Sequence, residues 1–244
     1  MNQKGNALFL ILIAVALFAA LSYAVTQSGR SGGGVDKEQA IIGASQLTQY
    51  ASQISQSIQR LKLLGGCTDN EISMWHDSNG DSIEDTNDDY YNATSPIDHS
   101  CHVFHTDGGA VPYTPPDTSW LNTAHQAKGF YGQYFFTGMT QILGVGTDTC
   151  PTVGCELLMY IPYLNKTIAE QVQKGMLSTT TIQTENIINL EPQANDRFRG
   201  VYGGGYSTSD VGDQSTMLAG KQTGCLLRPI AVGEYACYHV LIAR

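Results

Sequence analysis

The chain has 244 residues, of which 14% are charged and 42% hydrophobic, with a formal net charge of -9 at pH 7. The few lysines and arginines are scattered, so the chain lacks the basic patch of a nucleic-acid-binding protein, and we expect no DNA or RNA partner. About 220 residues follow the N-terminal segment, enough for one globular domain with its own core.

The chain begins with a short polar leader followed by an apolar segment. Lys4 is the one charged side chain before Asn6, and the run from Ala7 to Val25 contains none. A helix of this length, at about 1.5 Å per residue, is just long enough to cross a bilayer core of roughly 30 Å. Lys4 and the terminal amine predict that the N-terminal end stays in the cytoplasm and that the rest lies outside it.

A glycine-rich stretch and an amphipathic pattern come next. Residues 25–34 indicate a hinge or a local break. Beyond them apolar residues recur at alternating steps of four and three, which predicts a helix over 35–64 with Asp36 and Glu38 in its first turn. Gly65 and Gly66 then end it. The apolar stripe consists of Ala40, Ala44, Leu47, Ala51, Ile54, Ile58 and Leu61. We expect the stripe to pack on the chain's own sheet, and a coiled coil between identical chains is the alternative.

The cysteines form an even set that lies entirely after the apolar segment, which indicates an oxidising compartment and disulfide bonds. The connectivity does not follow from the sequence, but local closure favours Cys150–Cys155 and Cys225–Cys237 and leaves Cys67–Cys101. A zinc site is the rival interpretation, because Cys150 and Cys155 are close in sequence. No second matching pair of cysteines exists to complete such a site.

The remainder reads as loops, strands and one short helix. Residues 67–117 are rich in Asp, Asn, Ser, Thr, Gly and Pro, which predicts a long irregular region. Buried strands are predicted within 129–146 and over 155–164. Asn165 can cap a helix that continues to Gly175, with Ile168, Val172 and Met176 on one face. Residues 226–232 and 235–242 are expected to form a hairpin.

These elements predict an α+β fold, in which a long N-terminal helix with a membrane half and an amphipathic half packs on an antiparallel β-sheet with long disulfide-tied loops. The expected organisation is a leader at 1–5 and an apolar transmembrane and assembly helix with a glycine-rich hinge at 6–34. An extracytoplasmic globular domain follows at 35–244, with the amphipathic helix at 35–64 and the loops and sheet at 65–244.

The leader ending in Lys4-Gly5, the apolar segment directly after it, the amphipathic continuation and the cysteine-closed C-terminal segment together resemble a type IV pilin or pseudopilin. The resemblance implies that a membrane prepilin peptidase cuts after Gly5 and that the new N-terminus, Asn6, is methylated. It also implies that Cys225 to Cys237 is similar to the disulfide-bounded C-terminal loop of that family. Family members usually carry glutamate where this chain has Leu10, and Phe or Met where it has Asn6. These departures argue against a standard subunit more than against the family.

The resemblance implies a structural subunit of a type IV pilus-like or pseudopilus filament, in adhesion or secretion. Such a subunit would be held in the inner membrane and would then self-associate, with the inner-membrane assembly machinery, into a periplasmic or cell-surface filament. A helix that is apolar on every face needs lipid or neighbouring helices around it. The residues expected to pack between copies are Leu8, Leu10, Ile11, Ile13 and Leu17. No local arrangement of nucleophile, base and orienting acid is recognised, so we expect no enzymatic activity.

Two other fates of the N-terminus remain open. Ser22 and Ala24 are spaced for signal-peptidase cleavage after Ala24, which would release a protein beginning at Val25. An uncleaved anchor would begin at Met1. The alternative function is accordingly a secreted or membrane-anchored, disulfide-stabilised module that binds a ligand or calcium.

The densest acidic segment, residues 77–89, has a spacing of oxygen-bearing side chains close to that of a calcium loop. The candidate ligands are Asp77, Asn79, Asp81, Asp85 and Asp88. The glycine of this segment, Gly80, stands earlier than in such loops, and no glutamate closes it, so a solvated acidic turn is the alternative.

Three histidines, His99, His102 and His105, recur at every third residue around Cys101 and could suggest a transition-metal site. On a strand, however, His102 would point to the face opposite the other two. We therefore expect them to be ordinary surface or core histidines.

Overall fold

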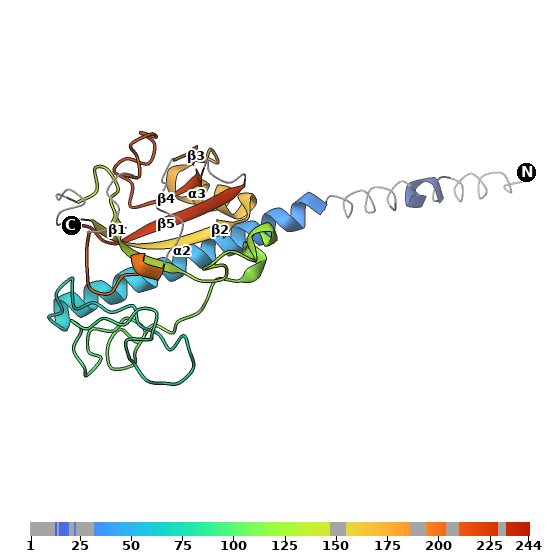
Figure 1. Ribbon diagram of the computed structural model, residues 1–244. Coiled ribbons are helices and arrows are strands. Elements are labelled where there is room, and N and C mark those ends of the chain that lie inside the picture. Colours follow the sequence, from blue (N-terminus) through green and yellow to red (C-terminus); the bar gives the residue numbers. More distant parts are fainter. Residues whose placement is uncertain are drawn as a thin grey trace, which may run out of the picture. The chain divides into compact units, whose positions relative to one another are not determined.

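The structure is a computed structural model that describes residues 13, 15–19, 22, 32–146, 155–185, 194–203, 210–228 and 233–244. The chain forms two compact units, Met1–Gln39 and Ala40–Arg244. In the first unit, the described residues before Gly32 are helical. In its described residues, the second unit contains the sheet, helix α3, three short 3-10 helices and the loop section (Figure 1).

The amphipathic helix α2 spans Gly32–Leu64 and ends just before Gly65 and Gly66, as predicted. All seven residues of the predicted stripe are buried, none more than 5% exposed, and they belong to one core with residues of the sheet. The start of the helix differs from the prediction, because Gly32, Gly33 and Gly34 are helical. The break expected at 25–34 is therefore wrong for these three residues, and its other residues, 25–31, lie outside the described residues. Asp36 and Glu38 consequently lie beyond the first turn.

Within the described part of the chain, the sheet has five strands in the order β1-β2-β5-β4-β3. Three of its ladders, β1 with β2, β2 with β5 and β4 with β5, are antiparallel, whereas β3 runs parallel to β4. The strands are β1 Phe135–Thr140, β2 Glu156–Leu164, β3 Gln183–Thr184, β4 Thr223–Arg228 and β5 Glu234–Ile242. The predicted terminal hairpin is confirmed in β4 and β5.

The predicted fold class needs two corrections. The sheet is mixed and not antiparallel, because β3 enters it after α3 and pairs in parallel with β4 at the edge. The prediction also placed an apolar membrane half ahead of the amphipathic half. Within the part of the chain that the structure describes, no helix combines the length and the apolar character that a membrane crossing needs.

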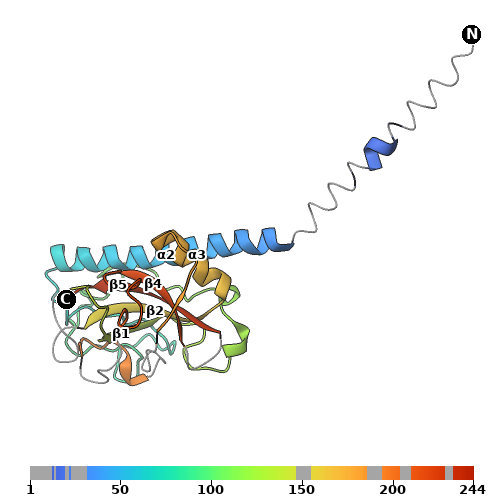
Figure 2. The same cartoon turned by 90° about the horizontal axis from the view of Figure 1, so that it is seen from above.

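Both faces of the sheet are covered, which explains why all nine residues of β2 are buried. Leu157, Met159 and Ile161 share a core with α2 and α3. Leu158 and Tyr160 point to the opposite face, where a second core forms with loop residues Ile142, Val211 and Leu218. This alternation is the two-residue period of a strand. Figure 2 shows α2 and α3 along the same side of the sheet.

Helix α3 spans Lys166–Leu177 after Asn165. Asn165 makes no side-chain cap bond, and its Nδ2 instead donates to the carbonyl of Ser119 at 3.1 Å. Ile168 and Val172 are buried as predicted, but Met176 is 37% exposed. The helix ends one residue later, at Leu177, which packs against the second core.

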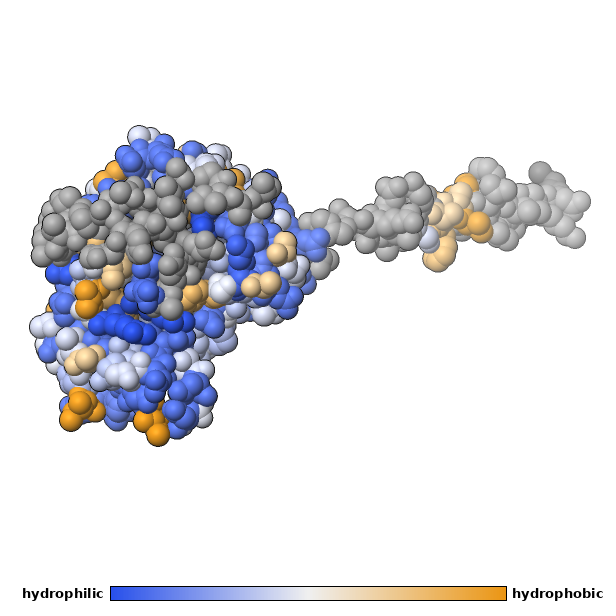
Figure 3. Space-filling model, viewed as in Figure 1, coloured by the Kyte–Doolittle hydropathy of each residue, from blue (hydrophilic) through white to orange (hydrophobic). Residues whose placement is uncertain are grey.

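Residues 67–117 contain neither helix nor strand, as the composition predicts, apart from an isolated bridge between Ser73 and His102. This loop section lies beside the C-terminal half of α2 (Figure 1), where Ser57 Oγ donates to the carbonyl of Gly109. In the view of Figure 3 the surface of the second unit is mainly hydrophilic, with separate apolar spots. Exposed apolar side chains on the loops include Ile83 and Ile97.

Candidate functional site

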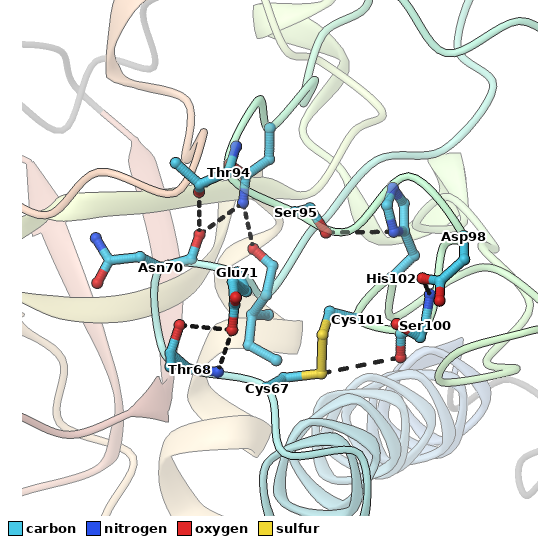
Figure 4. Close-up of a disulfide and its surroundings, with 12 residues drawn as sticks. Cys67, Thr68, Asn70, Glu71, Thr94, Ser95, Asp98, Ser100, Cys101 and His102 are labelled. Atoms are coloured by element: carbon cyan, nitrogen blue, oxygen red, sulfur yellow. Dashed lines mark hydrogen bonds between the residues drawn. A yellow bond between two sulfur atoms is a disulfide. The ribbon is translucent and has the colours of Figure 1, made fainter.

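The loop section is tied to the end of α2 by the disulfide Cys67–Cys101, drawn in Figure 4. Around this disulfide, the Ser73 N–H donates to the carbonyl of Cys101 and the Val103 N–H donates to the carbonyl of Ser73, both at 3.0 Å. These bonds align two stretches of loop backbone far apart in sequence. The segment that carries the histidines is therefore linked covalently to Cys67, three residues after the end of α2, and by hydrogen bonds to Ser73.

Two of the predicted disulfides are confirmed. Besides Cys67–Cys101, the structure has Cys225–Cys237, which links directly opposite residues of β4 and β5. Cys155 is also disulfide-bonded. Cys150 lies outside the described residues, so its predicted pairing with Cys155 stays a prediction.

The three histidines lie on successive turns and not on a strand. The His99 N–H donates to the carbonyl of Pro96, and the His102 N–H donates to the carbonyl of His99, each at 3.1 Å. A turn of this kind returns to the same side after about three residues. The ring of His99 accordingly lies 4.8 Å from that of His102 and 4.3 Å from that of His105, centroid to centroid. The expectation that the histidines diverge is wrong.

Glu84 completes a compact cluster with two of these histidines. Its carboxylate oxygens lie 3.0 and 2.9 Å from Nε2 of His102, and Oε2 lies 3.3 Å from Nε2 of His99. The His102 side chain is 1% exposed, that of Glu84 is 13% exposed and that of His99 is 30% exposed. The cluster therefore reaches from the interior of the loop section to its surface. Burial lowers the pKa of His102, which favours its neutral imidazole at pH 7.

Neighbouring side chains hold the cluster in place. Ser95 Oγ lies 3.4 Å from Nδ1 of His102 (Figure 4). The other ring nitrogen, Nε2, faces Glu84. The Trp75 indole stacks on the His99 ring and meets the His102 ring edge-on. Its Nε1 in turn donates to Asp88 Oδ2 at 2.8 Å. Trp75 thus forms an apolar wall with a fixed orientation.

The five predicted calcium ligands occupy two consecutive turns. In the first, Asp77 Oδ1 accepts from the Gly80 N–H at 2.7 Å and Asp81 Oδ1 accepts from the Ile83 N–H at 2.8 Å. Asn79 Oδ1 belongs to the same turn and accepts from the Asp81 N–H. In the second turn, Asp85 Oδ1 accepts from the Asn87 N–H.

Asp88 differs from the other four predicted ligands, because it is buried and one of its oxygens accepts from both Trp75 and the Asp85 N–H. The side chains are engaged locally instead of converging on one point. Calcium binding by this loop stays a prediction.

Most of the predicted processing and assembly residues lie outside the described residues: Gly5, Asn6, Leu8, Leu10 and Ile11. The other two, Ile13 and Leu17, are helical, and their exposed fractions in the single chain are 39% and 65%. These two apolar side chains are available to a neighbouring surface.

Sequence reasoning missed Glu84 and Trp75. The sequence does not indicate that Glu84 contacts the histidines, because Glu84 lies inside the acidic segment and 18 residues before His102. The available signal was the three-residue spacing of the histidines next to Pro96 and Asp98, residues typical of turns. Asp98 Oδ1 indeed accepts from the Ser100 N–H at 3.0 Å.

The acidic loop section with its histidines, and helix α2 packed on the sheet, are the features that a related protein would share. A comparison with known protein families, with characterised proteins and with solved structures found no match.

Proposed function

We propose that the protein is a structural subunit of a type IV pilus-like or pseudopilus filament. The observation that carries the proposal is the order of its parts along the chain: a prepilin-like leader and an apolar segment precede α2, whose stripe is buried in the core of the second unit. A helix rooted in a globular core in this way can display that unit on a filament built from the apolar segments.

The physical driving force is burial of the N-terminal apolar side chains. Burying a Leu, Ile or Phe side chain is worth roughly 1.5 to 3 kcal/mol, and ordering costs offset part of the sum. Ile13 and Leu17 are exposed in the single chain and would lose this exposure between copies. Leu10 stands where glutamate is usual, so no charge is buried between the apolar segments of neighbouring copies. The contact that would help to align those copies is also lost.

The proposed life cycle has two stages. The apolar N-terminal segment holds the new subunit at the inner membrane, with the N-terminus cytoplasmic and the disulfide-bonded unit outside. A prepilin peptidase then cuts after Gly5, and the assembly machinery adds the subunit to a periplasmic or cell-surface filament, where it serves adhesion or secretion. The confirmed disulfides support an oxidising compartment for the second unit.

Electron microscopy of cells tests this function with a pair of variants. Deletion of Gly5 should abolish filaments, because the peptidase site is lost. Ala24→Leu is the matched control, since it blocks signal-peptidase cleavage and leaves the prepilin site intact, so filaments should persist. Filaments that survive deletion of Gly5 would contradict the proposal.

The alternative, a secreted ligand- or calcium-binding module, is favoured by the Ser22 and Ala24 spacing and by the acidic turns at 77–89. Under this alternative Ala24→Leu would prevent release of soluble protein. Its calcium part is tested by thermal melts in excess calcium and in excess chelator. Calcium bound to the folded state raises the melting temperature. Identical melting temperatures in excess calcium and in excess chelator would contradict calcium binding.

A further inference from the structure

The cluster formed by Glu84, His99 and His102 has the dimensions of a metal site. The three potential ligand atoms all lie within 4.8 Å of one another. Ligands about 2.0 to 2.2 Å from a tetrahedral zinc ion lie roughly 3.3 to 3.6 Å apart. The carboxylate of Glu84 is 3.3 Å from Nε2 of His99 and 2.9 Å from Nε2 of His102. No two of the three ligand atoms are farther apart than 4.8 Å, so the half-buried His99 is the ligand whose ring would have to move to close the set around one ion.

The cluster is held together by the backbone and not by chance contact of surface side chains. The two histidines are one turn apart and flank Cys101, whose disulfide fixes the turn to the end of α2. Gly108 packs so closely over this turn that a Cβ there would overlap the carbonyl oxygens of His99 and His102. The ligand-bearing segment is therefore preorganised, which reduces the ordering cost of binding an ion.

The neighbouring side chains orient the three potential metal ligands and leave them free to bind an ion. Ser95 contacts the other ring nitrogen of His102, the arrangement that orients metal-bound imidazoles in proteins. Within the described residues, the ion-pair partners of Glu84 are the two histidines, so no lysine or arginine there competes for its carboxylate. Trp75 shields one side from water.

The donor atoms decide which ion fits. Two imidazole nitrogens and one carboxylate suit zinc and similar transition metals, whereas calcium and magnesium prefer oxygen donors alone. Three protein ligands leave at least one coordination position for water or for a fourth ligand. His105 is the nearest further candidate by ring position, but its Nδ1 accepts from the Asp107 N–H and it does not belong to the set of converging atoms.

We propose that Glu84, His99 and His102 bind one Zn²⁺ ion, which clamps the acidic segment at 77–89 onto the histidine turn. The site does not depend on filament formation, and its role is to hold two loops together on the second unit. Within the described residues it is the one group of His, Cys, Asp and Glu side chains close enough to hold a single ion.

Zinc titration by calorimetry tests the proposal on the full chain in detergent micelles, without a histidine tag. The wild type should bind one equivalent of Zn²⁺, and excess Ca²⁺ should not displace it. Glu84→Gln, His99→Asn and His102→Asn should each weaken zinc binding by more than about a hundredfold. This exceeds the loss expected when a residue that only orients a metal ligand is removed.

His105→Asn is the matched control. It removes the adjacent imidazole but offers an oxygen in place of the Nδ1 that accepts from Asp107. Zinc affinity should fall by less than about tenfold, the lower limit of the loss expected when a residue that orients a metal ligand is removed. Unchanged affinity in all three ligand variants would overturn the proposal, and so would an equal loss in His105→Asn.

Two readouts on the wild type need no variant to fold. A zinc concentration about a hundred times the Kd should raise the melting temperature by roughly 5 to 10 °C. Co²⁺ should give the visible absorption of a four- or five-coordinate ion, and one equivalent of Zn²⁺ should abolish it. A Co²⁺ spectrum identical to that of the free aqueous ion, together with an unchanged melt in Zn²⁺, would overturn the proposal.

Discussion

Glu156 begins β2 with a fully buried side chain, and one of its carboxylate oxygens accepts from the Ile142 N–H at 3.0 Å. Burial, with a smaller contribution from Asp210, raises the pKa of this carboxyl from 4.5 to about 7. A raised carboxyl pKa means that the folded state holds the proton more tightly than the unfolded state does. At the scale of the single residue, Glu156 thus makes the stability of the second unit depend on pH.

The stabilisation from Glu156 is complete below about pH 4.5 and is lost as the pH rises through about 7. We expect the wild type to lose about 2 to 3 kcal/mol of unfolding free energy between pH 5 and pH 8 relative to Glu156→Gln. The glutamine keeps the acceptor for Ile142 and cannot ionise. Urea unfolding of both proteins across this range measures the difference, and parallel pH profiles would contradict the assignment.

At the scale of the element, α2 links the loops to the sheet, because one side of it carries the buried stripe and the disulfide joins its end to the histidine turn. The stripe is built from alanines early in the helix and from larger Leu and Ile side chains later. The C-terminal half of α2 therefore contributes most of the burial against the core.

Ile54 has no exposed surface, whereas Ile42 on the same helix is 57% exposed. Ile54→Ala should lower the free energy of unfolding by about 2 to 5 kcal/mol, and Ile42→Ala should change it by no more than about 0.5. Chemical denaturation at several protein concentrations provides the measurement. Equal losses for Ile54→Ala and Ile42→Ala would contradict the burial of the stripe in the core of the second unit.

The disulfide Cys67–Cys101 joins two cysteines that are 34 positions apart in the sequence. Its removal in Cys67→Ala/Cys101→Ala should cost about 3 to 4 kcal/mol, because the unfolded chain regains the entropy of the open loop. Unfolding without reductant, compared with the wild type, checks the value. A loss below about 1 kcal/mol would show that the hydrogen bonds around Ser73 hold the loop without the cross-link.

The sequence predicts the structure best where apolar residues recur with a regular period, because that period indicates which side chains are buried. The α2 stripe and β2 could be predicted, because steps of three and four or a continuous apolar run match one geometry. β3 could not, since Gln183 and Thr184 are too short a segment for any alternation. The cluster at Glu84 was missed because its members converge through turns and long-range contacts, which a strand interpretation of the histidine spacing excluded.

At the scale of the whole molecule, the apolar side chains are concentrated in two parts of the chain, the cores of the second unit and the N-terminal segment. In the second unit the large apolar side chains form two cores on either side of the sheet, and the surface in Figure 3 is mainly hydrophilic. The N-terminal segment is apolar throughout, and its described side chains Ile13 and Leu17 are exposed. Burial of such apolar side chains is favourable, and the proposed self-association through the N-terminal segment would remove Ile13 and Leu17 from water.

The measurement that tests this account most directly is the mass of the N-terminal peptide of the mature protein, isolated from the native cell. Prepilin processing predicts a chain that begins at Asn6 and carries one methyl group on its amine. A chain that begins at Val25 would identify a secreted protein, and one that begins at Met1 would identify an uncleaved anchor. Either of these two results would contradict the proposed filament subunit.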